Sequence, residues 1–210
     1  NCLGIIRIGD NSSGMGIIVG RCYGTVSNCH VTNSTLSSND SFYTGGISGY
    51  TNGRIINCSV KNTTLEASLG SLGIITGYLH EGNIMNSYSC HNTVNKKSTH
   101  NGGICGYGLN GTLTNCYVYS NNNVKGHIIG TGKHAVITYC YCDQLPFIYS
   151  NEEGCSYGKN YQYTTNFTAT SNNTPIYQLL NQWIESQDTT SDTYTPWKEH
   201  SSLPAAFITQ

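Results

Sequence analysis

The residues of this chain that are best suited to metal or thiol chemistry are its 10 cysteines. A zinc site usually needs paired Cys-x-x-Cys motifs, and a disulfide framework is typical of short, irregular domains. The closest pair here is Cys140-x-Cys142, with no second pair nearby, in a chain of 210 residues. The spacing therefore favours neither kind of site, and we predict no metal and no cofactor.

The acidic residues and the histidines could support acid–base chemistry if the fold gathered them. Enzymes that cleave polysaccharides need a calcium cage or a paired acid and base. The 11 acidic residues and seven histidines are scattered along the chain and match no zinc-protease motif. Glu152 and Glu153 are neighbours that would point to opposite faces of a strand. We therefore predict no catalytic residues and a protein that is not an enzyme.

The charge of the chain limits the partners that it can bind. Charged residues make up 10% of the chain and the formal net charge is −1, whereas an ordinary globular protein has about 25% charged residues. A nucleic-acid site would need a basic patch, and only Lys96 and Lys97 are adjacent. No apolar run approaches the roughly 20 residues that cross a bilayer. We predict neither a nucleic-acid partner nor a membrane span, and the sequence leaves the oligomeric state open.

An internal repeat organises most of the chain. Its anchor asparagines, each followed by Cys or Ser, recur at intervals of 29 residues, at Asn28, Asn57, Asn86 and Asn115. A glycine stands four residues before each anchor, and a branched apolar residue stands two before it. Segments with two glycines four residues apart recur at 16–20, 45–49, 73–77 and 102–106. Because several residue types recur together at the same spacing, the pattern indicates a structural repeat.

Each repeat is built from short strands and corners. Its β-branched runs are three to six residues long and are broken by Gly, Asn-Gly or Ser/Asn clusters. Alternation places Cys58 and Val60 on one face, whereas Ile55 is out of phase with them, so the chain must turn at Asn57. One unit cannot bury its apolar face alone. We therefore predict an all-β parallel solenoid of about five to six coils over residues 1–147, with strands stacked at about 4.8 Å.

Two columns of this predicted solenoid are expected to be structural ladders. The asparagines mark a corner, where each side-chain amide can bond to the asparagine of the next coil. The cysteines point inward as buried free thiols, with disulfides between neighbouring coils or metal binding as the alternatives. The ladder residues are Cys29, Asn57, Cys58, Asn86, Asn115 and Cys116.

The repeat resembles a known family. The pattern Gly-[Gly/Ile]-Ile-x-Gly-Tyr, followed by Gly-x-Ile-x-Asn-Cys, stands at 45–58, 73–87 and 102–116. It is similar to the GLUG-type repeats of extracellular proteins from Bacteroides-like bacteria. The resemblance covers residues 1–147 and implies a right-handed parallel β-helix in a secreted or cell-surface, adhesin-like protein. The copy at 126–140 departs from the pattern, so we expect a distorted coil there.

Beyond residue 147 the repeat stops, and we predict a capping segment over 148–210. Thr174 and Pro175 form a helix start, and the apolar residues that follow recur on one face. The sequence therefore predicts a short α-helix over about 175–186. Because the open end of a solenoid exposes unpaired strand edges, we expect this helix to lie across the last coil.

Outward-facing tyrosines are the candidate binding residues. Alternation places Tyr88, Tyr117, Tyr119 and Tyr141 on the outer face of the C-terminal half. Such an aromatic patch suits a glycan or a host or partner protein. A tail packed over the same tyrosines, and plain exposed stacking, are the alternatives.

A second column of tyrosines follows a glycine of the repeat, at Tyr50, Tyr78 and Tyr107. We interpret this column as a corner stack that holds the register of the coils. The sequence thus predicts a non-catalytic surface module, with a carbohydrate-active enzyme or its accessory arm as the alternative.

Overall fold

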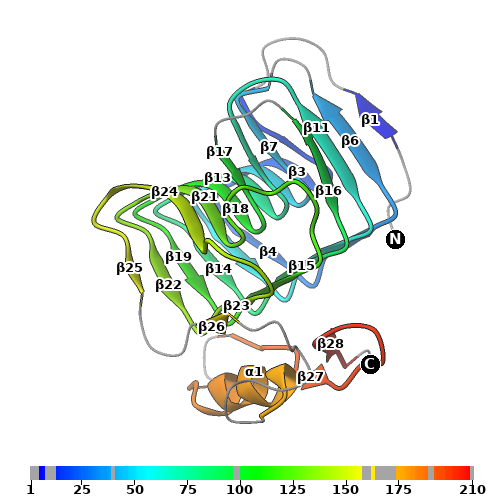
Figure 1. Cartoon of the computed structure of the whole chain (residues 1–210), viewed down its shortest axis with the longest axis vertical. Coiled ribbons are helices and arrows are strands. Elements are labelled where there is room, and N and C mark those ends of the chain that lie inside the picture. Colours follow the sequence, from blue (N-terminus) through cyan, green and yellow to red (C-terminus); the bar gives the residue numbers. More distant parts are fainter. Residues whose placement is uncertain are drawn as a thin grey trace.

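Most of the residues that the structure, a computed structural model, describes form a β-solenoid of short parallel strands (Figure 1). One α-helix and a small antiparallel pair of strands near the C-terminus lie beside it. The predicted fold class is therefore confirmed. The structure describes residues 5–7, 13–38, 41–96, 100–157, 162–163, 174–188 and 192–208.

A full coil passes through five parallel sheets, numbered here 1 to 5 in chain order. Sheet 1 contains β2 (Met15–Gly16), β7 (Tyr43–Gly45), β12 (Ser71–Gly73) and β17 (His100–Gly102). Sheet 2 contains β3 (Val19–Cys22), β8 (Ser48–Thr51), β13 (Thr76–His80), β18 (Cys105–Leu109), β21 (Ile129–Lys133) and β24 (Ile148–Glu153). Sheet 3 contains β4 (Thr25–Ser27), β9 (Arg54–Ile56), β14 (Asn83–Met85), β19 (Thr112–Thr114), β22 (Val136–Thr138) and β25 (Ser156–Tyr157).

The last two sheets complete each coil. Sheet 4 contains β5 (His30–Thr32), β10 (Ser59–Lys61), β15 (Tyr88–Cys90), β20 (Tyr117–Tyr119), β23 (Tyr141–Cys142) and β26 (Gln162–Tyr163). Sheet 5 contains β1 (Ile5–Arg7), β6 (Thr35–Ser38), β11 (Thr64–Ala67) and β16 (Thr93–Lys96).

Equivalent residues of successive repeats lie side by side. In sheet 3, Ile55 pairs with Val26 on one side and with Ile84 on the other. The backbone groups that point along the stack therefore find partners in the neighbouring coils, as buried peptide groups require. Ile55 and Ile84 are completely buried. The core is a continuous column of aliphatic side chains inside the coils.

Asn57 turns the chain between sheets 3 and 4. Its φ is 55°, and the matching Asn86 and Asn115 have φ values of 48° and 56°. Asparagine tolerates this left-handed conformation better than most other residues. Asn86 Nδ2 donates to Asn57 Oδ1 over 2.8 Å, and Asn115 Nδ2 donates to Asn86 Oδ1 over 2.7 Å. The chain turns at the asparagine column, and the side-chain amides of that column form a hydrogen-bonded ladder.

The cysteines that follow this corner point into the solenoid. Cys58 and Cys116 are completely buried, and Cys29 is half-buried. The thiol of Cys58 donates to the carbonyl oxygen of Ile56 over 3.3 Å. Burial raises the pKa of the Cys58 thiol to about 12, so it is protonated at neutral pH. The nine cysteines of the described residues are all free thiols.

The solenoid continues beyond residue 147, so the predicted boundary at 148 is wrong. β24 pairs with β21, β25 pairs with β22, and β26 pairs with β23, all in parallel. Ladder pairing uses backbone groups, and it therefore continues where the glycine and asparagine columns have already been lost. The one register shift in β24 falls between Gly132 and Lys133 of its partner. These two residues belong to the repeat copy at 126–140, whose sequence departs most from the pattern and where a distorted coil was predicted.

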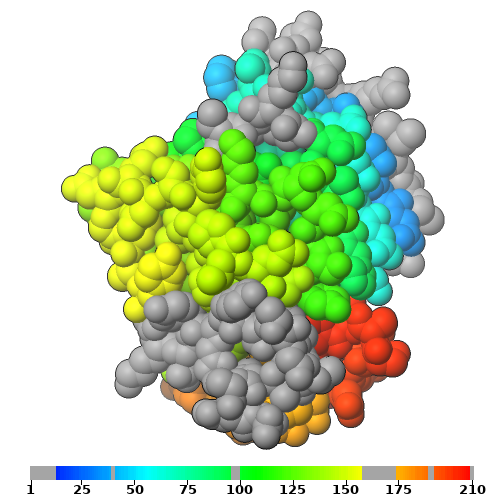
Figure 2. All heavy atoms as spheres, in the orientation of Figure 1, coloured from blue at the N-terminus to red at the C-terminus, as the bar shows by residue number. Residues whose placement is uncertain are grey.

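The C-terminal segment, defined here as the described residues 174–188 and 192–208, packs on the flank of the solenoid (Figures 1 and 2). It contains α1 (Ile176–Glu185) and the antiparallel strands β27 (Trp197–Lys198) and β28 (Ala206–Phe207). The helix thus forms where predicted. Its predicted place across the last coil is wrong, because the segment contacts several successive coils, from Asn57 to Asn115.

Candidate functional site

The C-terminal segment covers the tyrosines that were predicted to form a binding patch. Tyr88, Tyr117 and Tyr141 are only 8%, 0% and 1% exposed, and Tyr119 is half-buried. The rings of Tyr88 and Tyr117 stack with their centroids 4.8 Å apart. The segment packs these side chains against them: Ile176, Leu180, Trp197, Leu203 and Phe207. The prediction of an exposed patch is wrong and the covering-tail alternative holds, because large aromatic rings gain most from burial.

Hydrogen bonds from the asparagine ladder hold this segment in place. Asn86 Nδ2 donates to the carbonyl oxygen of Thr195 over 2.9 Å, and the indole N–H of Trp197 donates to Asn86 Oδ1 over 2.6 Å. The backbone N–H of Thr195 donates to Asn57 Oδ1 over 3.1 Å. The hydroxyl of Tyr117 donates to the carbonyl oxygen of Ala205 over 2.6 Å. The ladder is therefore an internal docking strip for the chain's own C-terminus.

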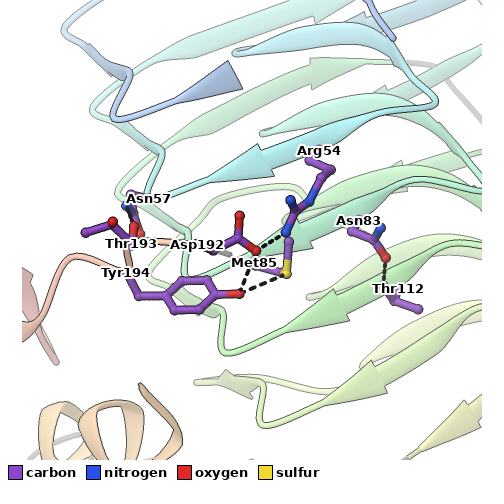
Figure 3. A network of polar contacts seen from close by, with 8 residues as sticks. All are labelled: Arg54, Asn57, Asn83, Met85, Thr112, Asp192, Thr193 and Tyr194. Atoms are coloured by element: carbon purple, nitrogen blue, oxygen red, sulfur yellow. Dashed lines mark hydrogen bonds and ion pairs between the residues drawn. The ribbon is translucent and has the colours of Figure 1, made fainter. Parts of the chain in front are cut away.

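Polar contacts on sheet 3 add to this docking, as Figure 3 shows. Asp192 forms an ion pair with Arg54 of β9. The hydroxyl of Tyr194 donates to Asp192 Oδ2 over 3.3 Å and lies 3.6 Å from the sulfur of Met85. The outer surface at the corner of sheets 3 and 4 is thus occupied by the C-terminal segment.

The other tyrosine column, on sheet 2, stays partly exposed. Tyr50, Tyr78 and Tyr107 lie in register on β8, β13 and β18, and all three are half-buried. The ring centroids of Tyr50 and Tyr78 are 5.5 Å apart, and those of Tyr78 and Tyr107 are 5.4 Å apart. The rings are tilted by about 50° to one another. They contact one another as the predicted corner stack would, and they also present ring surface to solvent.

Further rings widen this column into an aromatic face. Tyr43 of β7 stacks on Tyr78, with centroids 4.7 Å apart and planes 17° apart. His100 of β17 meets Tyr107 edge-on at 5.3 Å. Tyr23 lies 5.8 Å from Tyr50 and is 64% exposed. We define the aromatic face as Tyr23, Tyr43, Tyr50, Tyr78, His80, His100 and Tyr107.

Polar groups border the aromatic face and fix its hydroxyl groups. Nδ1 of His80 lies 3.1 Å from the Tyr50 hydroxyl and 3.0 Å from Nδ2 of Asn52. The Tyr107 hydroxyl donates to Glu152 Oε2 over 2.5 Å. At the other end, the guanidinium of Arg21 lies 5.7 Å from the centre of the Tyr50 ring. The face therefore combines apolar ring surface with hydrogen-bonding groups of fixed position.

The hydroxyls of Tyr78 and Tyr107 are neutral at physiological pH, because the pKa of each is raised. Burial, together with the neighbouring Tyr43 and Tyr50, raises the pKa of Tyr78 to about 12. Burial and the hydrogen bond to Glu152 raise the pKa of Tyr107 above its usual value. Burial also lowers the pKa of His100, which favours its neutral form. These hydroxyls can therefore both donate and accept hydrogen bonds.

Three of the described acidic residues make contacts with three different partners. Asp192 pairs with Arg54, Glu152 bonds to Tyr107, and Glu153 lies 3.3 Å from the ammonium group of Lys133. In the described ranges, no three side chains of His, Cys, Asp or Glu are grouped so that they could hold a metal ion. The same ranges contain no helix with the length and apolar character needed to span a membrane.

Comparison of the chain with protein-family models, with curated proteins and with solved structures gives no match. The resemblance to GLUG-type repeats therefore stays a prediction that depends on the repeat residues alone. The fold places the chain in the class of parallel β-solenoids.

Sequence reasoning recognised the column of Tyr50, Tyr78 and Tyr107 and missed the residues that widen it. Tyr43 stands two residues before the Gly45-Gly46 pair, and His80 stands two residues after Tyr78. The alternation of strand β13 places His80 on the same side as Tyr78, so this neighbour could have been found. The contact with Tyr43 joins two different sheets, and no spacing within one strand predicts it.

Proposed function

We propose that the chain is a non-catalytic module of a secreted or cell-surface protein, and that it binds an extended glycan along its aromatic face. The observation that carries this proposal is the column of Tyr50, Tyr78 and Tyr107. Successive rings in it are 5.5 Å and 5.4 Å apart and half-buried. The described C-terminal residues pack on sheets 3 and 4. The column lies on sheet 2, and its neighbours Tyr43 and His100 lie on sheet 1.

The chemistry of tyrosine suits a sugar. A tyrosine ring offers an apolar surface to the C–H groups of a pyranose, and its hydroxyl bonds to sugar hydroxyls. The bordering amide, imidazole and carboxylate groups of Asn52, His80 and Glu152 supply the few fixed polar contacts that orient a ligand. The low charge of the chain fits a neutral or weakly charged partner.

The repetition of the face favours a polymer over a single sugar. Three successive coils present equivalent rings, at Tyr50, Tyr78 and Tyr107, with a pitch of about 4.8 Å along the stack, which is close to the length of one sugar residue. A chain that runs along the stack would meet the same contact at each residue. Several weak contacts in line then act together, because each later contact is intramolecular.

A glycan array followed by titration calorimetry tests the proposal. Wild-type protein should bind at least one polysaccharide, and Tyr78→Ala should weaken that binding at least about tenfold, whereas Tyr78→Phe should retain most of it. Tyr23→Ala, at an exposed ring of the same face, avoids a large packing change. Tyr177→Ala on α1 is the matched control and should bind as wild type does.

The unfolding midpoint of each variant shows whether a loss of binding reflects a loss of folding. Wild-type affinity in both Tyr78→Ala and Tyr23→Ala would overturn the proposed site. An array with no bound glycan, together with a protein partner captured through the same face, would overturn the proposed ligand.

A further inference from the structure

A hollow of about 270 Å³ lies where the C-terminal strands meet the first coils of sheet 4. Ser59 and Lys61 of β10 and Tyr88 of β15 form its wall on the solenoid. Lys198 of β27 and Phe207 of β28 form the opposite wall. The two walls are joined by ring contacts, because the centroids of Tyr88 and Phe207 are 5.3 Å apart.

The lining of this hollow is basic. Two lysines, Lys61 and Lys198, and two histidines, His30 and His200, line it, and none of the described residues that line it is acidic. The chain has only 10 lysines and arginines and a net charge of −1, so this concentration of cationic groups is local. Glu199 lies between Lys198 and His200 in the sequence, is exposed, and is not part of the lining.

Among the described residues, neither lysine has a carboxylate partner. The ion pairs formed within the described ranges involve Arg54, Lys133 and His134, and neither Lys61 nor Lys198. Two like charges that face one hollow repel each other, and an anion placed between them would relieve that repulsion. Two of the few ammonium groups of the chain thus line a hollow that holds no counter-charge from the described residues. The missing charge is therefore one that a ligand can supply.

The remaining lining offers ring surface and hydroxyl groups. Nδ1 of His30 lies 2.9 Å from Ser59 Oγ. Burial lowers the pKa of His30, so this imidazole is neutral at physiological pH and acts as a hydrogen-bonding group. Phe207 presents its ring beside His30, with centroids 5.5 Å apart. An apolar ring wall next to hydroxyl groups is the kind of lining that fits a pyranose.

A second hollow of about 480 Å³ adjoins the first and shares His30 and Phe207 with it. Its described lining residues include Asn28, Asn57 and Thr195, and none of them is a lysine, an arginine or an acidic residue. Small-molecule sites usually measure about 300–1,000 Å³. The two hollows together therefore have room for a ligand of one acidic and one neutral unit.

We propose that this seam binds an acidic sugar, with its carboxylate between Lys61 and Lys198 and its ring against Phe207. The adjoining uncharged hollow then takes the neighbouring sugar of the same glycan. This site lies on sheet 4, whereas the aromatic face lies on sheets 1 and 2. The proposal therefore does not depend on the function proposed above.

Titration with a matched pair of sugars, followed by NMR and calorimetry, tests the site. Methyl β-glucuronide and methyl β-glucoside differ in the carboxylate, and the glucuronide should bind at least about tenfold more tightly because a charge-assisted contact is lost in the glucoside. The indole N–H resonance of Trp197, beside the hollow, should shift only with the glucuronide. Inorganic sulfate is the third probe and should bind more weakly than the glucuronide.

Charge-neutral variants locate the binding. Lys61→Met and Lys198→Met keep most of the side chain and should each weaken glucuronide binding at least about tenfold. Lys125→Met makes the same change of net charge elsewhere, beside Tyr149, and should leave the affinity unchanged. Tyr78→Ala should also leave it unchanged, which separates failure of this site from failure of the aromatic face.

Four results would overturn the proposal. They are equal affinity for glucuronide and glucoside, sulfate binding as tight as glucuronide binding, an equal loss of affinity in Lys125→Met, and no binding of any probe. Far-ultraviolet circular dichroism of the lysine variants confirms that the solenoid is folded in each comparison.

Discussion

Replacing Asn86 by alanine should detach the C-terminal segment while the solenoid stays folded. Asn86 is completely buried and makes four side-chain hydrogen bonds, to Asn57, Asn115, Thr195 and Trp197. Asn57 and Asn115 keep other partners in the variant. The carbonyl oxygen of Thr195 and the indole N–H of Trp197 lose the partners described above.

The expected loss follows from these two groups and from the backbone. Each buried polar group left without a partner costs about 1–3 kcal/mol. Asn86 also has a φ of 48°, and a left-handed residue other than Gly, Asn or Asp costs about 1–2 kcal/mol. The two groups and the backbone together should therefore destabilise the native protein by about 3–8 kcal/mol, which is comparable with the whole stability of many domains.

Two optical signals separate docking from folding. Both tryptophans of the chain, Trp183 and Trp197, lie in the C-terminal segment, so their fluorescence reports docking. Far-ultraviolet circular dichroism reports the strands of the solenoid. In urea, the fluorescence transition of Asn86→Ala should precede its circular dichroism transition, which is the mark of sub-global unfolding.

Asn110→Ala is the matched control for this experiment. Asn110 also has a left-handed backbone, with φ of 53°, and it is exposed at the surface. Its replacement should cost only the backbone contribution of about 1–2 kcal/mol. If Asn86→Ala loses no more stability than Asn110→Ala, or if its two transitions coincide, the ladder does not hold the segment and the reasoning fails.

Three further predictions concern stability and thiol reactivity. Tyr78→Ala should lower the thermal midpoint, because it removes a half-buried ring that stacks on Tyr43. The expected loss of stability is about 1–3 kcal/mol. An unchanged midpoint in differential scanning calorimetry would show that the tyrosine column does not hold the register of the coils. Stability should fall at alkaline pH, because the pKa values of Cys58 and Tyr78 in the folded protein are raised to about 12 from 9.0 and 10.0. The unfolded chain therefore loses these protons first, and stability declines between about pH 9 and pH 12. Urea midpoints measured at pH 7, 9 and 11 check the sign, and a midpoint that rises with pH would contradict it. The thiols of Cys58 and Cys116, both completely buried, should react with a thiol reagent only after unfolding. Rapid reaction of these thiols in the native protein, located by peptide mapping, would show that the cysteine ladder is accessible to solvent.

The solenoid can be predicted from the sequence because the same pattern of apolar residues recurs in each repeat. One strand of three residues carries little information, but Ile55, Ile84 and Leu113 at equal intervals indicate stacked strands whose side chains share a face. The corner at Asn57 follows from a parity argument that needs only neighbouring residues. The helix also follows from local residues, because Pro175 and the apolar residues after it predict its start. The N-cap is Pro175 itself, with no side-chain capping hydrogen bond, so the predicted cap at Thr174 is wrong.

Which outer face stays exposed could not be predicted from the sequence. Alternation shows that Tyr88 and Tyr117 point out of the coil, and so do Tyr50 and Tyr78. Their different exposure depends on where residues far along the chain dock, and the bond from Trp197 to Asn86 spans 111 positions. The continuation of the solenoid through β24 was missed for a related reason, because backbone pairing needs no repeated side chain.

The docking of the C-terminal segment also restricts the number of repeats that the solenoid can have. Asn57 bonds to the carbonyl oxygen of Thr193 and Asn86 to that of Thr195, so the segment advances two residues between these two coils. The next rung, Asn115, bonds to Leu180 of the helix. Loss of one 29-residue repeat would remove one rung of the ladder and leave two residues of the segment out of step. A repeat array can usually gain or lose units freely. In this chain the length of the C-terminal segment ties the array to one size.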